Sequence, residues 1–367
     1  MDKIKVLHVT FDMAIAGTEQ VIRQLVENTD KARFDCEIMC IDGKIGELGQ
    51  VLAEKGFKLH TLKRKASGLD FELIKQLRAF VKENNIQVLH CHQYTPYVYG
   101  LFSSFGTKAK VIFTEHGRFY PDSYKWKRML LNPVLSLFTA HITAISKATA
   151  EALVKYENFP RRKVQVIYNG INVDTESFKD EGDLKEELHI PADAKVLGTI
   201  SRLDPIKNQP MMIEAFAEVL KSHPNTYLLI VGDGPERQKL ETLCKTLKVE
   251  NKVLFTGFKV NPQRYFNIID IFLLSSLSEG TSMTLLEAMA FEKPSVVTDV
   301  GGNPEIVVDG ETGLVTPTKN SDQFSASINK LLSTSDLEKL LGIAAKDRYS
   351  KIFTANAMTN KYSNIYL

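Results

Sequence analysis

The sequence predicts an α/β protein made of two doubly wound domains, each with a mostly parallel sheet and helices on both faces. Two series of short apolar runs alternate with segments of helical periodicity, one starting at Ile4 and the other at Lys195. Each unit is short enough for the right-handed crossover that joins neighbouring parallel strands. The chain has 367 residues, which is enough for two domains that each bury a core.

The composition is that of an ordinary globular protein, with 25% charged and 44% hydrophobic residues. The formal net charge of +2 argues against a dedicated nucleic-acid partner, because basic residues are not in large excess. No apolar run reaches the roughly 18–20 residues that cross a bilayer, and the N-terminus does not resemble a signal peptide. Four cysteines show neither disulfide nor zinc spacing. We therefore expect a cytoplasmic protein with reduced thiols, working in the cytosol or at the inner face of the membrane.

The first series begins with a strand, a loop that contains Gly17 and a helix. This loop lacks the G-x-G-x-x-G fingerprint, which disfavours a dinucleotide-dependent dehydrogenase. The predicted strands are residues 4–10, 35–41, 58–62, 88–90, 111–114, 141–145 and 164–168, with helices at 45–55, 71–83 and 147–156.

Histidines occur near two of these predicted strand ends. His90 and His92 form a His-x-His pair without a nearby carboxylate, so we expect them to face a cleft at the end of the strand and not to bind a metal. His116 follows the strand at 111–114 and precedes Gly117, at the edge of the sheet where α/β proteins place functional groups. This position suits either a functional histidine or a structural one whose hydrogen bonds are satisfied within the fold.

Residues 119–138 interleave basic and large apolar side chains. One interpretation, which we favour at this point, is a core helix with one solvated basic face. The alternative is contact between the region from Tyr120 to Leu131 and the inner membrane surface or a lipid-linked acceptor.

The second series carries polar motifs at its strand ends. The predicted strands are residues 195–200, 226–231, 253–256, 270–274, 295–298 and 313–315, with helices at 209–221, 321–333 and 336–348. Arg202 and Lys207 follow the first strand, close to the start of a helix, where two cations are able to hold a diphosphate. The glycines that follow the next two strands, at 232 and 257, are weak signals when taken singly.

The most informative stretch is residues 278–317. Gly280 allows close approach of a ligand to the backbone, and the helix that starts near Met283 directs free N–H groups and its positive dipole end toward the carboxyl ends of the strands. Such a helix start suits a phosphate. Glu279 and Glu287 flank it and suit the hydroxyls of a sugar. The stretch therefore predicts a nucleotide-sugar site.

This stretch resembles the retaining glycosyltransferases of family 4, which have the GT-B fold. The resemblance rests on two glutamates separated by seven residues and on the three short motifs that follow: Glu279, Glu287, then Ala288-Met289-Ala290, Gly301-Gly302 and Glu305-Ile306-Val307. The chain departs from the family pattern at three places: Ala16 stands for the first of two glycines, Ser201 for the glycine of G-R-L, and Asn172 for the aspartate of N-G-I-D.

The resemblance implies a GT-B fold, with two Rossmann-like domains facing a cleft and a C-terminal helix that crosses back to the first domain. The acceptor-side domain would comprise residues 1–172 and 350–367, and the donor-binding domain residues 173–349. The implied reaction transfers a sugar from a nucleoside-diphosphate sugar and retains the anomeric configuration. A UDP-sugar is the first choice of donor and GDP-mannose the second. The implied acceptor is a hydroxyl of a glycan or a lipid-linked glycan in polysaccharide or glycoconjugate synthesis.

The resemblance also implies roles for single residues. The expected catalytic residues are His116, Arg202, Lys207 and Glu279. The expected donor-binding residues are Gly17, Gly232, Gly257, Phe258, Gly280, Thr281, Ser282, Met283, Thr284 and Glu287, of which Glu287 would hold the ribose. Because the chain has no Asp-x-Asp and cations cover the phosphate, neither metal nor cofactor is expected. Two alternatives stay open: a GT-B UDP-sugar 2-epimerase, which would be expected to lack the glutamate string, and a non-catalytic sugar-nucleotide-binding subunit.

Overall fold

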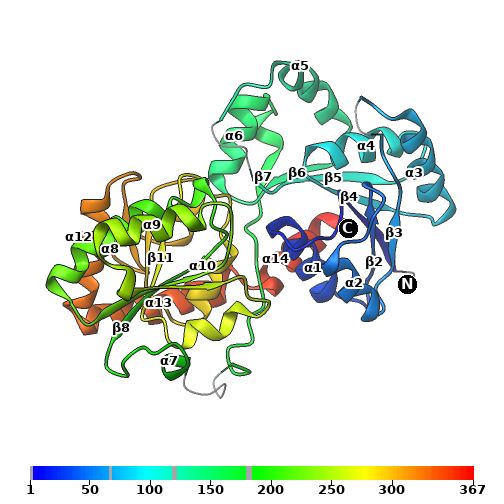
Figure 1. Ribbon diagram of the computed structural model, residues 1–367. Coiled ribbons are helices and arrows are strands. Elements are labelled where there is room, and N and C mark those ends of the chain that lie inside the picture. The colour runs from blue at the N-terminus through cyan, green and yellow to red at the C-terminus, as the bar shows by residue number, and fades with distance from the viewer. Residues whose placement is uncertain (1–2, 66–67, 118–121, 179–183) are drawn as a thin grey trace. The chain divides into compact units, whose positions relative to one another are not determined.

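The computed structural model describes residues 3–65, 68–117, 122–178 and 184–367. The chain forms two compact units (Figure 1): residues 1–171 with 353–367, called unit 1, and residues 172–352, called unit 2. The sequence analysis predicted that the chain passes from the first domain to the second after residue 172 and returns to the first domain at residue 350. The predicted fold class is confirmed, since each unit is an α/β layer structure around a parallel sheet.

Unit 1 contains a seven-stranded sheet in the order β3-β2-β1-β4-β5-β6-β7, and every neighbouring pair is parallel. The strands are β1 (Ile4–Thr10), β2 (Phe34–Cys40), β3 (Leu59–Thr61), β4 (Val88–His92), β5 (Lys110–Glu115), β6 (His141–Ala144) and β7 (Val164–Val166). The helices are α1 (Gly17–Asn28), α2 (Glu47–Glu54), α3 (Phe71–Glu83), α4 (Tyr94–Ser104), α5 (Trp126–Leu135), α6 (Lys147–Glu157) and α14 (Ala355–Tyr366), with short 3-10 turns η1 (Ser136–Phe138) and η2 (Arg161–Lys163). The direction of strand addition reverses between β1 and β4, which is where such sheets bind ligands.

Unit 2 contains a six-stranded parallel sheet in the order β10-β9-β8-β11-β12-β13. The strands are β8 (Lys195–Ile200), β9 (Thr226–Val231), β10 (Val253–Gly257), β11 (Ile271–Leu274), β12 (Ser295–Thr298) and β13 (Leu314–Thr316). The helices are α7 (Leu184–Glu187), α8 (Gln209–Ser222), α9 (Arg237–Leu247), α10 (Met283–Ala290), α11 (Asn303–Ile306), α12 (Ser321–Leu332) and α13 (Ser335–Ile352), with 3-10 turns η3 (Pro205–Lys207), η4 (Glu250–Lys252) and η5 (Pro262–Asn267). Its reversal of strand order lies between β8 and β11.

Helix α4 is an element that the sequence analysis missed. Its sequence contains Pro96 and Gly100, and both residues weaken a helical signal. The glycine has a packing reason, because a Cβ at Gly100 would lie 2.3 Å from Sγ of Cys91 on β4. Tyr97 is fully buried and stacks on Phe113 at 4.4 Å between ring centroids. The helix is therefore held by tertiary packing against the sheet.

The chain returns to unit 1 beside the point where it leaves it. Ile171 and Thr354 form a parallel bridge, and the backbone N–H of Ile171 donates to the carbonyl of Phe353 at 3.0 Å. Helix α14 then packs against α1, as the red and dark-blue helices of Figure 1 show. The last helix was predicted to return to the first domain, and α14 does pack within unit 1.

Helix α5 corrects a sequence-based interpretation. Large apolar side chains of this segment are exposed, among them Leu130 at 70% and Leu137 at 67%. The favoured interpretation of residues 119–138 as a core helix is therefore wrong for the described part of the segment. Tyr120, which began the alternative membrane region, lies outside the described residues. Across the described ranges, no helix combines the length and hydrophobicity needed to span a membrane.

Candidate functional site

In unit 2 the loops after β8 and β11 are held together at the reversal of strand order. The N–H of Leu277 donates to the carbonyl of Ile206 at 2.7 Å. The hydroxyl of Ser275 donates to the carbonyls of Lys207 and Asn208 at 2.9 and 3.0 Å. These bonds fix the loop that carries Lys207 against the loop that carries Glu279.

Lys207 and Glu279, both predicted site residues, are in direct contact. Nζ of Lys207 lies 2.6 Å from Oε1 of Glu279, and the hydroxyl of Ser276 donates to the same oxygen at 2.6 Å. The Glu279 side chain is only 8% exposed and that of Lys207 24%. A charge pair this shielded from water holds both groups in one place. Sequence reasoning missed Ser276, which gave no motif signal.

Arg202 does not join this pair. Its side chain is 72% exposed and forms an ion pair with Asp204, two residues away. Asp204 also accepts the N–H of Ile206 at 3.2 Å and so starts the 3-10 turn that leads to Lys207. The backbone of this turn is fixed, whereas the guanidinium of Arg202 faces solvent, where a phosphate is able to contact it.

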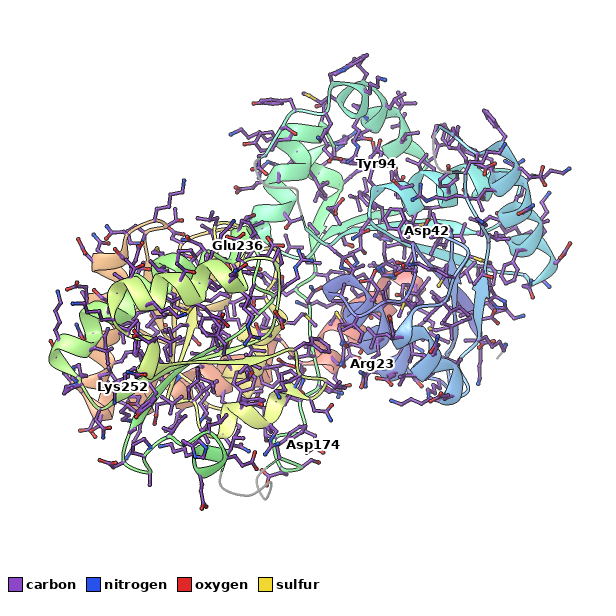
Figure 2. The ribbon with its side chains drawn as sticks, in the orientation of Figure 1. Arg23, Asp42, Tyr94, Asp174, Glu236 and Lys252 are labelled. Atoms are coloured by element: carbon purple, nitrogen blue, oxygen red, sulfur yellow. The ribbon has the colours of Figure 1, made fainter. Side chains whose placement is uncertain are left out.

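The glycine-containing loops after β9 and β10 lie next to this site. The N–H of Gly232 donates to the carbonyl of Gly257 at 3.0 Å. Gly232 has φ of 138°, and a Cβ there would lie 2.0 Å from the carbonyl oxygen of Ser201. Only glycine allows the β9 loop to approach the β8 loop this closely. Phe258 follows with its ring 62% exposed. Glu236, labelled in Figure 2, belongs to the same β9 loop, just before α9.

The start of α10 follows Glu279 directly, through Gly280 and Thr281. The hydroxyl of Ser282 caps the helix by accepting the N–H of Leu285 at 3.3 Å, and it contacts the hydroxyl of Thr284 at 3.2 Å. Met283 is the first helical residue.

Gly301, after β12, packs against the turn that carries Glu279. It has φ of 52°, and a Cβ there would lie 1.8 Å from the carbonyl oxygen of Glu279, which also accepts the N–H of Gly302 at 3.2 Å. The Gly-Gly motif therefore has a steric role in placing Glu279.

Glu287 lies farther along α10, away from the Lys207 contact. Its Oε1 accepts from Nε2 of Gln263, on η5, at 2.8 Å. Burial raises the pKa of Glu287 to about 7, and the hydrogen bond from Gln263 opposes that rise. The carboxyl group therefore changes its charge near neutral pH. Gln263 had no recognisable sequence signal.

In unit 1 a pocket of about 330 Å³ lies at the carboxyl ends of β4 and β5. Among its lining residues are His116, Tyr94 (labelled in Figure 2), Gln93, Lys125, Arg128 and Glu157. Arg128 pairs with Glu157 at 2.8 Å and lies 3.8 Å above the ring of Tyr94. Burial, and then the charge of Glu157, raise the pKa of Glu115 beside His116 to about 8.

Gly17, the remaining predicted site residue, is the first residue of α1 in unit 1. A Cβ at this position would meet no atom within 4 Å. Thr18 beside it accepts from Nε2 of Gln93 at 3.1 Å, which links the start of α1 to the His116 pocket. Gly17 and His116 thus belong to unit 1, whereas the other predicted site residues belong to unit 2.

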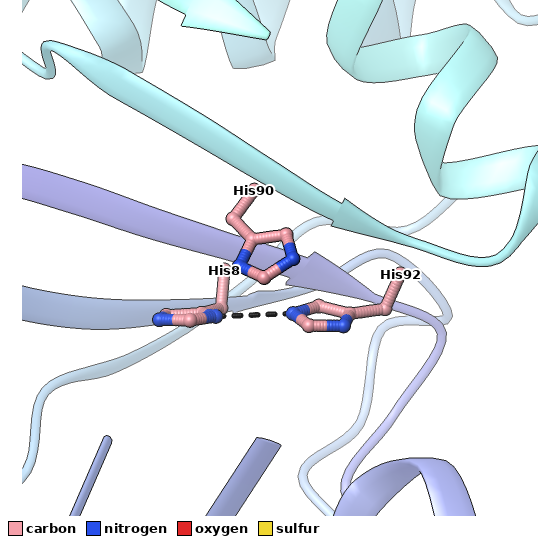
Figure 3. A group of neighbouring side chains, drawn as sticks. All are labelled: His8, His90 and His92. Carbon is pink, nitrogen blue, oxygen red and sulfur yellow. Dashed lines mark hydrogen bonds between the residues drawn. The ribbon is translucent and has the colours of Figure 1, made fainter. Parts of the chain in front are cut away.

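The His-x-His pair corrects a second prediction. Strand β4 continues through His92, and both His90 and His92 are fully buried instead of facing a cleft. They form a cluster with His8 of β1 (Figure 3) in which ring nitrogens lie within 4.8 Å of one another. Both nitrogens of His90 are already engaged, by Tyr366 of α14 and by Thr114, each at 2.7 Å. Hydrogen bonds therefore occupy both ring nitrogens of His90.

Comparisons with known proteins agree with the predicted family and fold. Residues 15–175 match the family model described as Glycosyltransferase Family 4, and residues 180–348 match that of Glycosyl transferases group 1. The chain is 28% identical to N-acetyl-alpha-D-glucosaminyl L-malate synthase of Bacillus anthracis, covering 88% of this chain and 93% of that protein. It is 26% identical to UDP-Gal:alpha-D-GlcNAc-diphosphoundecaprenol alpha-1,3-galactosyltransferase of Escherichia coli, covering 100% and 97%. The fold is similar to that of Anabaena Alr3699/HepE in complex with UDP, with a TM-score of 0.86, 21% identity and 99% of both chains covered.

Proposed function

Because this chain is a family-4 glycosyltransferase with the GT-B fold, we propose that it transfers a hexose from a nucleoside-diphosphate sugar, with retention, to a hydroxyl of a glycan or lipid-linked acceptor. The observation that carries the proposal is the Lys207–Glu279 pair, held at the reversal of strand order beside the start of α10. This edge of a parallel sheet is where phosphate-bearing ligands bind.

We propose a UDP-sugar as the donor, with GDP-mannose as the second choice. The similar Anabaena structure holds UDP, and the Escherichia coli relative is named for a UDP-galactose donor and a diphosphoundecaprenol acceptor. These likenesses favour uracil and a lipid-linked acceptor. Glu287 would accept hydroxyls of the ribose, and the exposed ring of Phe258 would lie near the base.

The proposed chemistry is charge stabilisation on the leaving diphosphate. As the bond to the sugar breaks, negative charge grows on the β-phosphate. Lys207, Arg202 and the amides at the start of α10 would stabilise that charge, and Glu279 would orient Lys207 and a hydroxyl of the donor sugar. Cationic side chains and amides would supply the charge that a divalent metal supplies elsewhere, so we propose that the activity persists in excess EDTA.

Calorimetric titration with UDP, GDP and ADP, followed by the corresponding sugar nucleotides, tests the proposal. We expect UDP to bind most tightly and a UDP-sugar to be turned over to UDP. Failure of all three nucleotides to bind would contradict the donor site. Release of an epimerised sugar nucleotide without UDP would identify the protein as a 2-epimerase. Binding of a sugar nucleotide without turnover would identify it as a non-catalytic binding subunit.

We also propose that unit 1 contacts an anionic membrane surface through α5 and η1. Six large apolar side chains there are each more than half exposed, and we call them the α5 apolar surface: Trp126, Leu130, Leu131, Val134, Leu137 and Phe138. The exposed cations Lys125 and Lys127 adjoin it. No acidic residue occurs between positions 123 and 150. Exposed apolar groups flanked by basic residues match the interface of an anionic bilayer, which would bring the enzyme to a lipid-linked acceptor.

Co-sedimentation with phospholipid vesicles tests this contact. We expect binding to vesicles that contain phosphatidylglycerol, weaker binding to phosphatidylcholine alone, and loss of binding in the double variant Leu130→Ser/Leu137→Ser. Leu340→Ser/Ile343→Ser, which removes exposed apolar side chains from α13 of unit 2, is the matched control. If the wild type binds neither kind of vesicle but is a dimer in sedimentation velocity experiments, the α5 apolar surface is instead a contact between two copies of the chain.

A further inference from the structure

Three histidines of unit 1 form one continuous chain of hydrogen-bonded rings. Nδ1 of His8 lies 3.0 Å from Nε2 of His92, the contact drawn as a dashed line in Figure 3. Nδ1 of His92 then lies 2.8 Å from Nε2 of His116, the ring that lines the pocket. His8 and His92 are fully buried. The chain thus runs from the interior of the sheet to the pocket.

All three rings are neutral near pH 7. Burial lowers the pKa of His8 and of His116 to about 3, and it lowers that of His92 well below its usual value. A neutral imidazole carries one N–H donor and one acceptor nitrogen. Each N···N contact needs one N–H donor and one acceptor nitrogen, so the position of the proton on one ring determines its position on the next ring.

Only two arrangements satisfy both contacts. In the first, every ring carries its proton on Nε2, so His116 presents a bare Nδ1 and His8 holds an unpaired N–H in the interior. In the second, every ring carries its proton on Nδ1, so His116 presents an N–H and His8 only a bare nitrogen. Among the described residues, Nε2 of His8 and Nδ1 of His116 are both buried, and neither has a hydrogen-bond partner.

The positions of the two ends distinguish these arrangements. A buried N–H without an acceptor is rarer and costlier than a buried acceptor without a donor. Nδ1 of His116 is also buried, but His116 as a residue is only partly buried and lines the pocket, so the second arrangement leaves its spare N–H on the ring that a bound ligand would adjoin. The first would strand its spare N–H at fully buried His8.

We propose that His8 and His92 are positioning residues that hold His116 in the Nδ1–H form, so that His116 donates a hydrogen bond to a substrate oxygen. This role rests on the proposed function, in which His116 belongs to the transfer site. His90 is excluded from the chain because its nitrogens are engaged by Tyr366 and Thr114.

NMR of the ligand-free protein with ¹⁵N-labelled histidine tests the chain without any activity assay. We expect scalar couplings across the hydrogen bonds between His8 Nδ1 and His92 Nε2 and between His92 Nδ1 and His116 Nε2, with the Nδ1–H form at His116. Absence of both couplings, or an Nε2–H form at His116, would overturn the proposal. The wild-type measurement decides the matter even where a variant fails to fold.

Two variants then separate positioning from packing. In His92→Phe, which keeps an aromatic ring, we expect His116 to lose its single tautomer and turnover to fall about tenfold or more. UDP affinity, measured as a check on unit 2, should stay within twofold. In His90→Gln, which disturbs the same cluster outside the chain, His116 should keep its Nδ1–H form. Loss of that form in both variants alike would assign the effect to packing. If His116→Ala keeps full turnover, the proposed role of His116 in transfer fails, while the couplings still report on the chain.

Discussion

Lys207 and Glu279 show how a single contact prepares the proposed donor site. The lysine is the cation that would meet a phosphate, and the glutamate that holds it at 2.6 Å also partly neutralises it. Nucleotide binding would therefore exchange one partner of Lys207 for another, with little loss of side-chain freedom because the lysine is already in place. Arg202, exposed and tied only to its neighbour Asp204, is the group expected to reorient toward the ligand.

Glu287 provides a residue-scale prediction. The pKa of its carboxyl group is raised to about 7, so the group is protonated below that pH and charged above it. A carboxylate accepts from both ribose hydroxyls better than a carboxylic acid does, so binding should favour the charged form. We expect UDP affinity to rise with pH by up to about tenfold per unit below pH 7 and to level off above it.

Calorimetry across the range from pH 5.5 to 8.5 measures this dependence. Glu287→Gln should bind UDP more weakly at high pH and show a flat profile, with KM raised more than kcat is lowered. Gln263→Ala, which removes the partner that lowers the pKa, should move the midpoint upward. A wild-type profile that falls as pH rises would contradict the ribose role.

At the scale of elements, Gly301 ties β12 to the turn that carries Glu279. Alanine there would be strained twice, because φ is 52° and because the Cβ would lie 1.8 Å from the carbonyl oxygen of Glu279. We expect Gly301→Ala to displace Glu279 and to weaken UDP-sugar turnover by about tenfold or more, a loss of roughly 1.4 kcal/mol.

Gly310→Ala is the matched control for this substitution. Gly310 also has a positive φ, of 74°, but a Cβ there meets no atom within 4 Å. Alanine at 310 should cost about 1–2 kcal/mol of stability and leave turnover unchanged. Equal loss of turnover in both variants would mean that backbone strain, and not the displacement of Glu279, is responsible.

Local sequence signals predicted most elements but not all. The strands at 195–200, 226–231 and 295–298 and the helix at 71–83 have the predicted bounds, because an apolar run or a capped amphipathic helix marks each one. Helix α4 was missed because Pro96 and Gly100 weaken its helical signal. Pro96 lies in the first turn, where no intrahelical N–H is lost, and Gly100 is required by the close approach to β4. The exposure of α5 was also unpredictable, since an apolar stripe is the same in sequence whether protein or another surface covers it.

The candidate site shows the same division. Glu279, Glu287, Arg202 and Lys207 were predicted as site residues from spacing and from residue type at strand ends. Their partners Ser276, Gln263 and Asp204 were not, because each pairing depends on how loops or neighbouring turns meet in space. The histidine chain was misinterpreted for a related reason, since nothing in the sequence shows that β4 continues to His92 or that β1 places His8 beside it.

At the scale of the whole molecule, the two passages of the chain between its units meet at Gly170. A Cβ at this position would lie 2.1 Å from the carbonyl oxygen of Thr354, and the N–H of Gly170 contacts Sδ of Met358 at 3.3 Å. We expect Gly170→Ala to push the returning segment away and to lower stability by about 1–3 kcal/mol. Thermal unfolding followed by circular dichroism measures the change.

Gly17→Ala serves as the control, because a Cβ there meets no atom within 4 Å. Its melting temperature should equal that of the wild type within a degree or so, whereas Gly170→Ala should melt several degrees lower. Equal melting temperatures for all three proteins would show that the crossing tolerates a wider spacing than this structure has.

The most direct test of the central claim is the rate at which Lys207→Ala releases nucleoside diphosphate from its sugar nucleotide, measured beside the wild type in excess EDTA. Lys239→Ala, which removes an exposed lysine from α9, is the control. Loss of one charge-assisted contact of roughly 1.5–3 kcal/mol should slow Lys207→Ala by about 10- to 200-fold, with the wild type and the control unaffected by EDTA. A Lys207→Ala rate within twofold of the wild type, or wild-type activity that vanishes in EDTA and returns with Mg²⁺, would contradict a phosphate site built on Lys207.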